Sequence, residues 1–554
     1  MLQTTVLNMG KQVQIVSVER DGTLQLNEKE LKRILLAPNV KDKPVAVVSI
    51  MGAFRQGKSF LLNFLLRYLR SRGRPNWMGD DDAPLTGFSW STTSERNTKG
   101  IHVWDEVFPV RTPAGDELVV LLMDTQGSFD SRSSADETAN LFALSILTSS
   151  IQIYNIFHNI QEDHLQHLQL VANYSMETQE STAESPFQKL VFLVRDWQFP
   201  DDKAHGAKGG RMLLEEFMST STEQHRDNID LRQCLSSCFS SVDCFLMPHP
   251  GKETTRRTFD GRLSKLDEDF KRGLRVLVPW LLGSVHLDAK KIGGKKITCR
   301  QLLNCITAYT DVFKDGRRPH VATILQATAE ENNRNAKEEA RTFYVNQLEK
   351  ATYKNLQELE EIHNVLLEKA KKIFEAARRV GGDEVKVRYL RILEEEIRLI
   401  FSCACNNQKV LDFQKKVDEM KANADEVSQM REKMKMREKE LEREKRILAL
   451  KSSGPSQKQK AMADEEEELK RQKAEFEARR DDLRAEMDAL RKEKERLERE
   501  REELKSRAKE TFSDTDGAWY FALAMLSTVF PPFGAILAGI AALIGAAFGL
   551  GRPR

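Results

Sequence analysis

An eight-residue stretch, Gly52 to Ser59, carries the residue types that bind phosphate groups. It reads Gly-Ala-Phe-Arg-Gln-Gly-Lys-Ser and fits the pattern G-x-x-x-x-G-K-S. Glycines at both ends let the backbone wrap closely around an anion, with its N–H groups directed at phosphate oxygens. We expect Lys58 to reach the β- and γ-phosphates and the hydroxyl of Ser59 to hold Mg²⁺. The stretch therefore predicts a site for a nucleoside triphosphate.

The segments on either side of this loop predict the structure that such a loop requires. Residues 45–50 are apolar and mostly β-branched, as in a buried strand. Residues 60–69 are rich in Leu and contain neither Gly nor Pro, as in a helix. The strand–loop–helix context separates a true phosphate-binding loop from a glycine-rich turn with an accidental Lys-Ser pair.

A second apolar run, residues 118–123, ends in Asp124-Thr125-Gln126-Gly127. A carboxylate at a strand end followed by a glycine is typical of the second half of a phosphate-loop site. We expect Asp124 to hold Mg²⁺ directly or through water, and Gly127 to turn its N–H to the γ-phosphate. The polar stretch 73–100 is too long for a simple turn, which favours a functional loop. Within it Thr98 is either a switch residue that joins the Mg²⁺ shell or ordinary surface.

A carboxylate that selects guanine is the next feature expected. The apolar run 190–194 ends in Arg195-Asp196. An Asp at a strand end can accept hydrogen bonds from guanine N1–H and N2–H₂, a donor pair that adenine lacks. The alternative for this dipeptide is a surface ion pair. Another apolar run, 242–246, leads into Met-Pro-His-Pro-Gly at 247–251, a rigid turn able to cover a base.

Several of these stretches resemble the atlastin family, dynamin-superfamily GTPases of the endoplasmic reticulum. The likeness covers roughly residues 10 to 405. It rests on unusual segments that occur in one order, namely Gly52 to Phe60, Asp124 to Asp130, Gln161 to Leu170, Val194 to Trp197, Pro248 to Gly251, Val278 to Leu282 and Leu325 to Glu330.

The resemblance implies GTP as substrate, GDP as product and Mg²⁺ as cofactor. It implies that Arg55 is a catalytic arginine finger supplied by the same chain, and that Arg195 and Asp196 replace the more familiar Asn-Lys-x-Asp guanine reader. The implied nucleotide contacts are Arg55, Gln56, Gly57, Lys58, Ser59, Phe60, Thr98, Gln126, Gly127, Arg195 and Asp196, and the implied metal ligands are Ser59, Thr98 and Asp124. Two positions depart from the family: Gln56 stands where Lys is common, and the loop 252–257 is more charged and shorter.

Three helices are expected after the first 315 residues, at about 320–350, 355–380 and 383–403. Three amphipathic helices bury their apolar faces by packing as a bundle. The resemblance implies that this middle domain swings against the GTPase domain during the nucleotide cycle. The linker around Gly316 is either the hinge of that motion or a plain connector.

A charged stretch, residues 407–512, follows where the family has its membrane hairpin almost at once. Apolar residues recur in it at every seventh position, from Phe413 to Leu504, and keep this phase across the break at 452–455. A coiled coil needs two apolar positions per heptad, and the second position is mostly charged after the break. We expect a weak homodimeric coiled coil, with a solvated single helix as the alternative. Either would form a rod that holds the GTPase away from its anchor.

The segment from Gly517 to Gly551 contains no charged residue and is typical of a membrane segment. Pro531-Pro532 divides it into two halves that are each short for a full span. We expect a shallow hairpin with both ends in the cytosol; a single kinked span and a buried soluble helix pair are the alternatives. No amphipathic stretch follows it, so efficient membrane fusion is in doubt.

Bulk composition limits the remaining possibilities. Lys and Arg (86) nearly balance Asp and Glu (84), so a nucleic-acid partner is not expected. Seven cysteines show no paired metal spacing and predict free thiols in a reducing compartment. The first residues lack a signal-peptide pattern, which predicts that most of the chain faces the cytosol.

Together these features predict an α/β phosphate-loop GTPase domain with a mixed sheet flanked by helices (1–315), a three-helix middle domain (316–406), a charged heptad helix or coiled coil (407–512) and a C-terminal membrane hairpin (513–554). The expected function is GTP-driven trans homodimerisation that tethers and fuses endoplasmic reticulum membranes. The alternatives are a tether that does not fuse, and a guanylate-binding-protein-like GTPase, which would release GMP.

Overall fold

A computed structural model of the chain describes residues 10–91, 98–127, 134–161, 185–219, 235–317, 319–377, 383–449, 457–512 and 517–527, with residues 164, 168, 170, 173 and 232. Contacts divide the chain into two compact units. The first comprises Met1–Ala336 and Ala377–Val387, and the second comprises Lys337–Ala376 and Arg388–Arg554. This division falls inside a helix and not at residue 315, and the four segments expected from the sequence stay a prediction.

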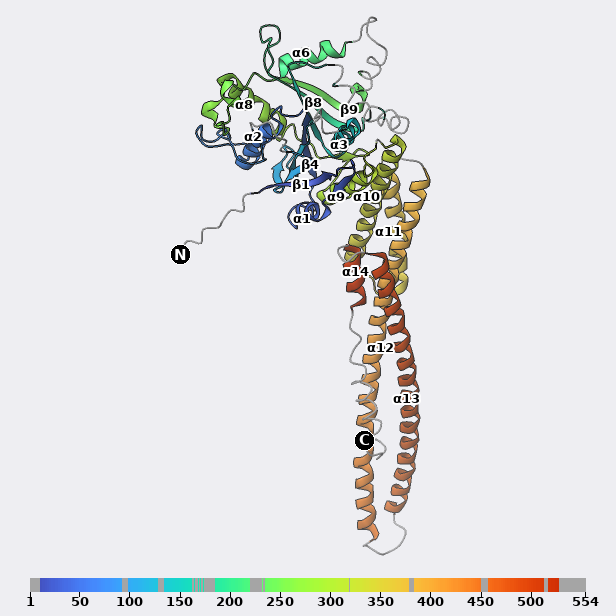
Figure 1. Ribbon diagram of the computed structural model, residues 1–554. Helices are drawn as coiled ribbons and strands as arrows, with labels where there is room; N and C mark the ends of the chain where they lie inside the picture. Colours follow the sequence, from blue (N-terminus) through green and yellow to red (C-terminus); the bar gives the residue numbers. More distant parts are fainter. Residues whose placement is uncertain are drawn as a thin grey trace, which may run out of the picture. The chain divides into compact units, whose positions relative to one another are not determined.

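A mixed sheet forms the centre of the first unit (Figure 1). Its order in the described residues is β2-β1-β4-β6-β3-β7-β8-β9, with β5 paired to β6. Strands β6, β3, β7, β8 and β9 are parallel, and the remaining pairs are antiparallel. The strands are β1 (Gln12–Val18), β2 (Leu24–Leu26), β3 (Val45–Gly52), β4 (Ile101–Trp104), β5 (Phe108–Arg111), β6 (Glu117–Thr125), β7 (Ile151–Phe157), β8 (Phe187–Arg195) and β9 (Phe239–Leu246). The predicted α/β class with a mixed sheet is confirmed.

Helices cover both faces of the sheet and bury two apolar cores (Figure 1). Strand β3 contributes alternate residues to the two cores, Val45 and Val47 to one and Ala46 and Val48 to the other. A strand covered on both faces has no polar alternation, which explains its continuous apolar sequence. The first core holds α1 (Glu28–Leu35), α3 (Ala135–Thr148) and α9 (Cys299–Val312); the second holds α2 (Lys58–Ser71) and α8 (Glu268–Leu282).

The remaining elements of this unit are short or lie at its edges. Helix α6 adjoins β9, and Cβ atoms added at Gly209 and Gly210 would meet neighbouring backbone, so small residues are needed there. The six cysteines in the described part are free thiols, as expected. These further elements are α6 (Ala207–Met218), η1 (Lys252–Thr255), η2 (Leu263–Lys265), β10 (Lys291–Ile292) and β11 (Lys295–Lys296).

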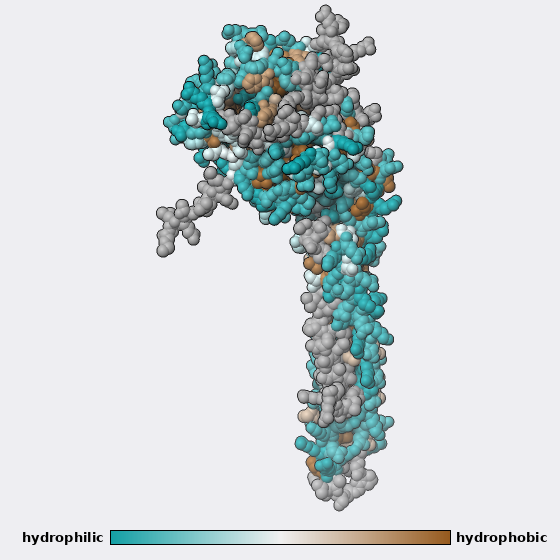
Figure 2. All heavy atoms as spheres, in the orientation of Figure 1, coloured by the Kyte–Doolittle hydropathy of each residue, from teal (hydrophilic) through white to brown (hydrophobic). Residues whose placement is uncertain are grey.

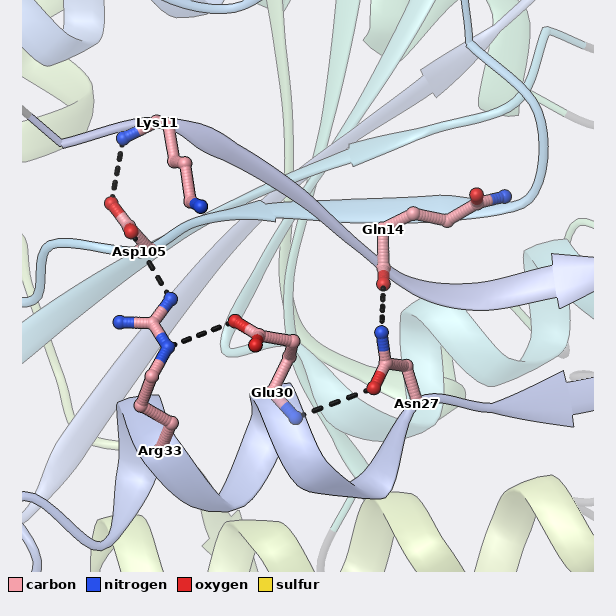
Figure 3. A network of polar contacts seen from close by, with 6 residues as sticks. All are labelled: Lys11, Gln14, Asn27, Glu30, Arg33 and Asp105. Atoms are coloured by element: carbon pink, nitrogen blue, oxygen red, sulfur yellow. Dashed lines mark hydrogen bonds and ion pairs between the residues drawn. The ribbon is translucent and has the colours of Figure 1, made fainter.

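Polar contacts tie α1 to the strands at one edge of the sheet (Figure 3). Asn27 caps α1 by accepting the N–H of Glu30 at 3.3 Å. Asp105, just after β4, accepts the N–H of Lys11 at 2.6 Å and a guanidinium N–H of Arg33 at 3.1 Å. Arg33 also donates to Glu30 at 2.8 Å. These hydrogen bonds hold α1 and the start of β1 against the end of β4.

Helices α10 (Val321–Lys350), α11 (Leu356–Ala376) and α12 (Asp383–Ala449) begin close to where the sequence predicted three helices. In the second unit the carboxylate of Glu396 accepts bonds from Lys337 at 2.5 Å and Arg341 at 3.1 Å. All three residues are less than a tenth exposed. A buried carboxylate is costly unless it is paired, so this contact favours a single register between α10 and α12.

The charged stretch after the bundle does not form the extended rod expected from the sequence. Helix α12 continues without interruption through the boundary predicted at residue 406. Helix α13 (Gln457–Thr511) then runs back along it, and the two lie side by side (Figure 1). We call residues 408–511 of this pair the arm. The heptad residues of the two helices face each other within one chain, which differs from both the homodimeric coiled coil and the solvated single helix.

The arm has an apolar seam and a regular set of ion pairs. Phe413, Met420 and Val427 of α12 share one buried cluster with Leu483, Leu490 and Leu497 of α13. Lys409 pairs with Glu500 at 2.7 Å, and seven residues on, Lys416 pairs with Glu493 at 3.0 Å. Further out, the pairs Arg437–Glu465, Lys445–Glu466 and Lys473–Glu438 join the two helices. From Lys409–Glu500 to Lys416–Glu493 the residue number rises on α12 and falls on α13, which is an antiparallel pairing.

The sequence of α12 explains why the two helices pair within one chain. Helix α12 carries a second apolar row, Val410, Val417 and Ala424, that belongs to the same buried cluster. A single apolar row on α13 is therefore enough to complete the cluster, and charged residues occupy the second heptad position of α13. The outer surface is hydrophilic where Figure 2 shows it.

We expect the variant Lys416→Cys/Glu493→Cys to form an intramolecular cross-link with a short bismaleimide, because the two side chains meet across the arm. The product should migrate as a monomer and carry one linker, as measured by mass spectrometry. Each single variant serves as control. A parallel coiled coil would instead give dimers from Lys416→Cys alone, and that result would contradict the antiparallel arm.

The C-terminal segment begins beside the base of the arm. Helix α14 (Gly517–Leu526) packs on α13 with Ala518, Phe521, Ala522 and Leu526 buried. The amide of Asn407 lies 3.5 Å from Met525 Sδ. The chain thus returns to the bundle before its apolar segment starts, and the arm does not separate the two. Among the helices that the structure describes, none is long and apolar enough to cross a membrane. Residues 528–554, most of the predicted hairpin, lie outside the described residues.

Candidate functional site

The phosphate-binding loop connects β3 to α2 in the predicted strand–loop–helix arrangement. A Cβ at Gly52 would lie 1.9 Å from the carbonyl oxygen of Asn155, so the strand must end in glycine there. Gly57 is the N-cap of α2, has φ 68° and supplies no side-chain cap. The N–H groups at the start of α2 are thereby left for an anion. Arg55 also has positive φ (63°) and is exposed in the middle of the loop.

A cavity of about 440 Å³ opens over this loop. Ten of the residues predicted to contact nucleotide line it: Arg55, Gln56, Gly57, Lys58, Ser59, Phe60, Thr98, Gly127, Arg195 and Asp196. The remaining lining residues are Phe54, Ser89, Trp90, Ser91, Phe157, His249, Pro250, Thr254, Thr255 and Phe259. Asp124 and Gln126 are not among the lining residues.

Asp124 lies behind the phosphate end of the cavity and reaches it through two hydroxyl groups. Its Oδ2 accepts hydrogen bonds from Ser59 Oγ at 2.6 Å and Thr98 Oγ1 at 3.1 Å. Burial raises the pKa of this fully buried carboxyl, against the opposing effects of Ser59, the charge of Lys58 and Thr98. Its Oδ1 is buried with no hydrogen-bond partner in the described part of the chain. A divalent cation would compensate the negative charge of this buried carboxylate. The hydroxyl oxygens of Ser59 and Thr98 and the carboxylate of Asp124 are therefore a set of oxygen ligands that fits Mg²⁺.

Lys58 lines the same cavity. Its ammonium donates to the carbonyl oxygen of Ala53 at 3.0 Å, and the residue is 7% exposed. Holding the ammonium against the loop keeps its charge at the floor of the cavity. There it can meet the terminal phosphates of a nucleotide.

The opposite end of the cavity is built from Arg195 and Asp196, which follow from the end of β8. Asp196 has φ 55°, and its Oδ1 is buried with no hydrogen-bond partner among the described residues. Its Oδ2 lies 3.8 Å from His249 Nε2. An unpaired carboxylate oxygen in the wall of a cavity is the acceptor that a base with two adjacent N–H donors needs.

Arg195 is buried and bonded to neighbouring parts of the site, so it does not form the surface ion pair considered as the alternative. Its guanidinium donates to the carbonyl oxygen of Gln56 at 3.4 Å and to Asn155 Oδ1 at 3.5 Å, and lies over the ring of Phe270. Burial lowers its pKa, and the charge of Asp196 acts in the opposite direction. Asn155 also donates to the Gln56 carbonyl at 3.0 Å. The two ends of the cavity are thus joined through the backbone of Gln56.

Gln126 takes a different place from the one expected. Its Oε1 accepts the N–H of Gly100 at 2.8 Å, and its Nε2 donates to Glu137 at 2.6 Å. These bonds direct the side chain away from the cavity, toward α3. Gln126 therefore supports the Thr98 loop, and a direct contact with the nucleotide is not supported by its position.

Sequence reasoning missed an aromatic wall and the bracing Asn155. The ring of Phe60 lies 5.1 Å from that of Trp90 and 5.9 Å from that of Phe259, measured between centroids. Trp90 lies in the polar loop and Phe259 in the charged segment after residue 251, where no periodic pattern marks them. An aromatic residue in an otherwise polar stretch, Trp90, was the available signal.

We expect Gly127→Ala to lower kcat/KM for GTP about 10²-fold, because small displacements of positioning groups have effects of this size. An added Cβ would lie 2.7 Å from Phe54 Cα and 3.1 Å from Lys58 Nζ, so the loop or the ammonium must shift. Steady-state kinetics measures the change. Gly115→Ala also adds a Cβ, with no atom within 4 Å but at a left-handed φ of 89°. It is the control for backbone strain outside the cavity and should leave turnover unchanged. Equal turnover in both variants would contradict the close approach.

The chain is similar in sequence to known proteins. Residues 21–291 match the family model of the guanylate-binding protein N-terminal domain, and residues 293–409 match that of the guanylate-binding protein C-terminal domain. Atlastin-1 of Macaca fascicularis is 45% identical over 391 residues, which cover 70% of this chain and 70% of that protein. Human Atlastin-2 is 46% identical over 392 residues (70% and 67%), and human Atlastin-3 is 43% identical over 405 residues (71% and 75%).

The similarity spans the nucleotide cavity and the helices that follow it. It ends near the start of the arm, since both family models stop by residue 409. The resemblance inferred from short motifs is therefore confirmed over the first 70% of the chain. The chain belongs to the atlastin family and is a GTPase that hydrolyses GTP.

Proposed function

We propose that this GTPase is anchored in the endoplasmic reticulum membrane and uses nucleotide-driven homodimerisation, through its GTPase and middle domains, to tether and fuse membranes. The observation that carries the nucleotide part is a pair of buried carboxylate oxygens, Asp124 Oδ1 and Asp196 Oδ1, which have no hydrogen-bond partner among the described residues. Asp196 lines the cavity, and Asp124 lies behind it, hydrogen-bonded to the lining residues Ser59 and Thr98. One carboxylate next to the phosphate loop and one in the cavity wall suit a guanine nucleotide and its metal ion.

The phosphate end would act mainly by positioning and charge. The N–H groups of residues 55–59 would hold the phosphate oxygens, and the ammonium of Lys58 would lie against the β- and γ-phosphates. Arg55, exposed in the loop with its guanidinium stacked on Phe54, would turn over the γ-phosphate in the transition state. A finger from the same chain needs no second subunit to complete the site.

A metal ion completes this end of the site. The hydroxyls of Ser59 and Thr98 would be its ligands, with Asp124 behind them as ligand or proton acceptor. Mg²⁺, when bound, neutralises charge that develops on the phosphates. Loss of the Thr98 hydroxyl bond would free the Thr98 loop after hydrolysis, as in other nucleotide switches.

The base end would select guanine. Asp196 Oδ1 would accept N1–H and Oδ2 would accept N2–H₂, while the neighbouring guanidinium of Arg195 holds Gln56 and Asn155 beside it. Phe60, Trp90 and Phe259 offer apolar surface along the cavity. The Thr254–Thr255 turn lies at its rim, although that loop departs from the family pattern.

The membrane part of the proposal rests on the uncharged segment 517–551 and on the family. Thirty-five residues without a charge suit a shallow membrane hairpin that turns at Pro531-Pro532. The relatives are named atlastins, and the reticulum is proposed for this chain by that likeness.

A second function, tethering without fusion, is favoured by the arm. The arm follows directly on the region shared with the family and adds a charged helical pair of about 60 Å, at 1.5 Å per residue. Such a body next to the anchor would keep two bilayers apart after docking. We rank it second because it rests on the arm alone.

Reconstitution of the full chain into two liposome populations tests the proposal. GTP, but not GDP, should produce lipid mixing between labelled and unlabelled vesicles. Clustering without lipid mixing would establish the tether instead. If vesicles neither cluster nor mix while GTP is hydrolysed, the membrane function is wrong.

A further inference from the structure

Helix α3 lies between the nucleotide site and the linker that leads into α10. It begins at Ala135, with Ser134 as its N-cap, and its first turns carry Glu137 and Asn140. Residues three apart share one face of a helix, so these two side chains lie one above the other. Each makes a polar contact with a different part of the fold.

Glu137 lies on α3 and contacts Gln126, next to the Thr98 loop. It accepts the Nε2–H of Gln126 at 2.6 Å. Gln126 and Gly100 are joined twice, by the Gly100 N–H to Gln126 Oε1 (2.8 Å) and by the Gln126 N–H to the Gly100 carbonyl (2.7 Å). Gly100 is two residues from Thr98, whose hydroxyl bonds Asp124. A displacement of the Thr98 loop therefore reaches Glu137 through the backbone of residues 98–100 and the hydrogen bonds of Gln126.

Asn140 contacts the linker. Its amide nitrogen donates to the carbonyl oxygens of both Gly316 and Arg317, each at 3.1 Å. The side chain is fully buried, and its Oδ1 has no hydrogen-bond partner among the described residues. Two donors of one amide thus hold two successive linker carbonyls, while the acceptor of the same amide is left unused.

The linker is also held from its other side. Gly316 has φ 71°, and a Cβ there would lie 2.4 Å from the carbonyl oxygen of Gly22 in the β1–β2 turn. The N–H of Leu24 donates to the carbonyl of Lys314 at 3.0 Å. Residues 314–317 are therefore clamped between this turn and α3. Helix α10 begins at Val321, and its residues from Lys337 onward belong to the second unit.

We propose that Glu137 and Asn140 are positioning residues that couple the Thr98 loop to the linker and so to the second unit. This inference rests on the proposed nucleotide cycle and names its internal connection. When the bond from Thr98 to Asp124 changes with the nucleotide, Gln126 and Glu137 shift α3, and Asn140 releases or re-forms its hold on the linker. The unused Oδ1 gives a second linker arrangement an acceptor for a backbone N–H.

The test measures the distance between probes on the two units of the full chain in detergent. Met212 on α6 and Val365 on α11 are exposed, and replacing each with a non-canonical amino acid allows a spin label to be attached without cysteine chemistry. In the wild type, a non-hydrolysable GTP analogue and GDP should give different distance distributions. Asn140→Asp has the same shape but no donor for the two carbonyls, and it should give one distribution in both nucleotides. Its kcat should stay within about threefold of wild type, because Asn140 does not line the cavity.

A second pair of variants separates coupling from folding. Glu137→Gln keeps an acceptor oxygen for Gln126 and should retain the nucleotide-dependent distance change, whereas Glu137→Leu should lose it. Equal melting temperatures show that the loss is not unfolding. The inference is overturned if Asn140→Asp responds to nucleotide like the wild type, or if the wild type shows no change. Because the probes report on one chain at low concentration, failure of dimerisation or fusion would not alter these outcomes.

Discussion

Arg55→Ala is expected to lower kcat for GTP hydrolysis about 10³-fold or more, the range found for arginine fingers. Arg55 lies at the centre of the phosphate loop, with its guanidinium 5.1 Å from the Phe54 ring centroid and its side chain exposed to the cavity. The charge that it would stabilise exists in the transition state and not in bound GTP. We therefore expect kcat to fall while KM changes little.

A second arginine, at the far end of the helix that follows the phosphate loop, serves as a matched control. Arg72, at the C-terminal end of α2, is also an arginine with positive φ (56°). Arg72→Ala removes the same side chain from a similar backbone conformation and should leave kcat unchanged. Arg55→Lys tests geometry, because a point charge replaces the planar fork, and it should recover only a small part of the rate. Turnover of Arg55→Ala within about threefold of wild type would contradict the finger.

Asp196→Asn is expected to lower kcat/KM for GTP about 10²-fold. A charge-assisted hydrogen bond contributes about 1.5–3 kcal/mol, and the substituted amide would turn a donor toward guanine N2–H₂. The same amide matches xanthine, whose 2-oxo group accepts a hydrogen bond. Xanthosine triphosphate should therefore become the better substrate of the variant, as measured by phosphate release with each nucleotide.

The reversal of preference makes this result specific. Asp201→Asn, an exposed position five residues further on, is the control and should keep the preference for GTP. A variant that loses activity toward both nucleotides to the same extent would indicate a folding defect. One that keeps its preference for GTP would show that Asp196 does not read the base.

The fold of the first unit could be predicted because its signals are local. Strand β3 is buried on both faces, and its short, largely apolar and β-branched sequence is typical of such a strand. The phosphate loop and the end of β6 could be predicted for the same reason, since glycine and carboxylate positions follow directly from the backbone path. The partners of Arg195 could not be predicted. Asn155 and the Gln56 carbonyl come from other strands and loops, and no spacing in the sequence relates them.

The arm was predicted wrongly, and the reason is physical. A heptad repeat shows that one helix face is apolar but does not identify the partner helix. Here the partner is the returning part of the same chain, and the charged second position of α13 is explained by the two apolar rows of α12. Lys409 pairs with Glu500 and Lys416 with Glu493 only because the two helices are antiparallel, and the heptad repeat does not indicate this direction.

Gln126 shows a similar limit at the site. Its place in the Asp-Thr-Gln-Gly motif predicted a nucleotide contact, and a motif fixes the backbone position but not the direction of a side chain. The partner that determines this direction, Glu137, lies on the next helix. In the structure Gln126 bonds to Glu137 of α3, where the motif had predicted a contact with the nucleotide.

We propose that GTP bound in this cavity drives the chain to form a homodimer. Sedimentation of the full chain in detergent, with a non-hydrolysable GTP analogue and with GDP, tests it most directly. We predict that the protein mass doubles with the analogue and not with GDP, and that Asp196→Asn dimerises with the xanthosine analogue instead. A chain that hydrolyses GTP but remains monomeric with every nucleotide would contradict the account.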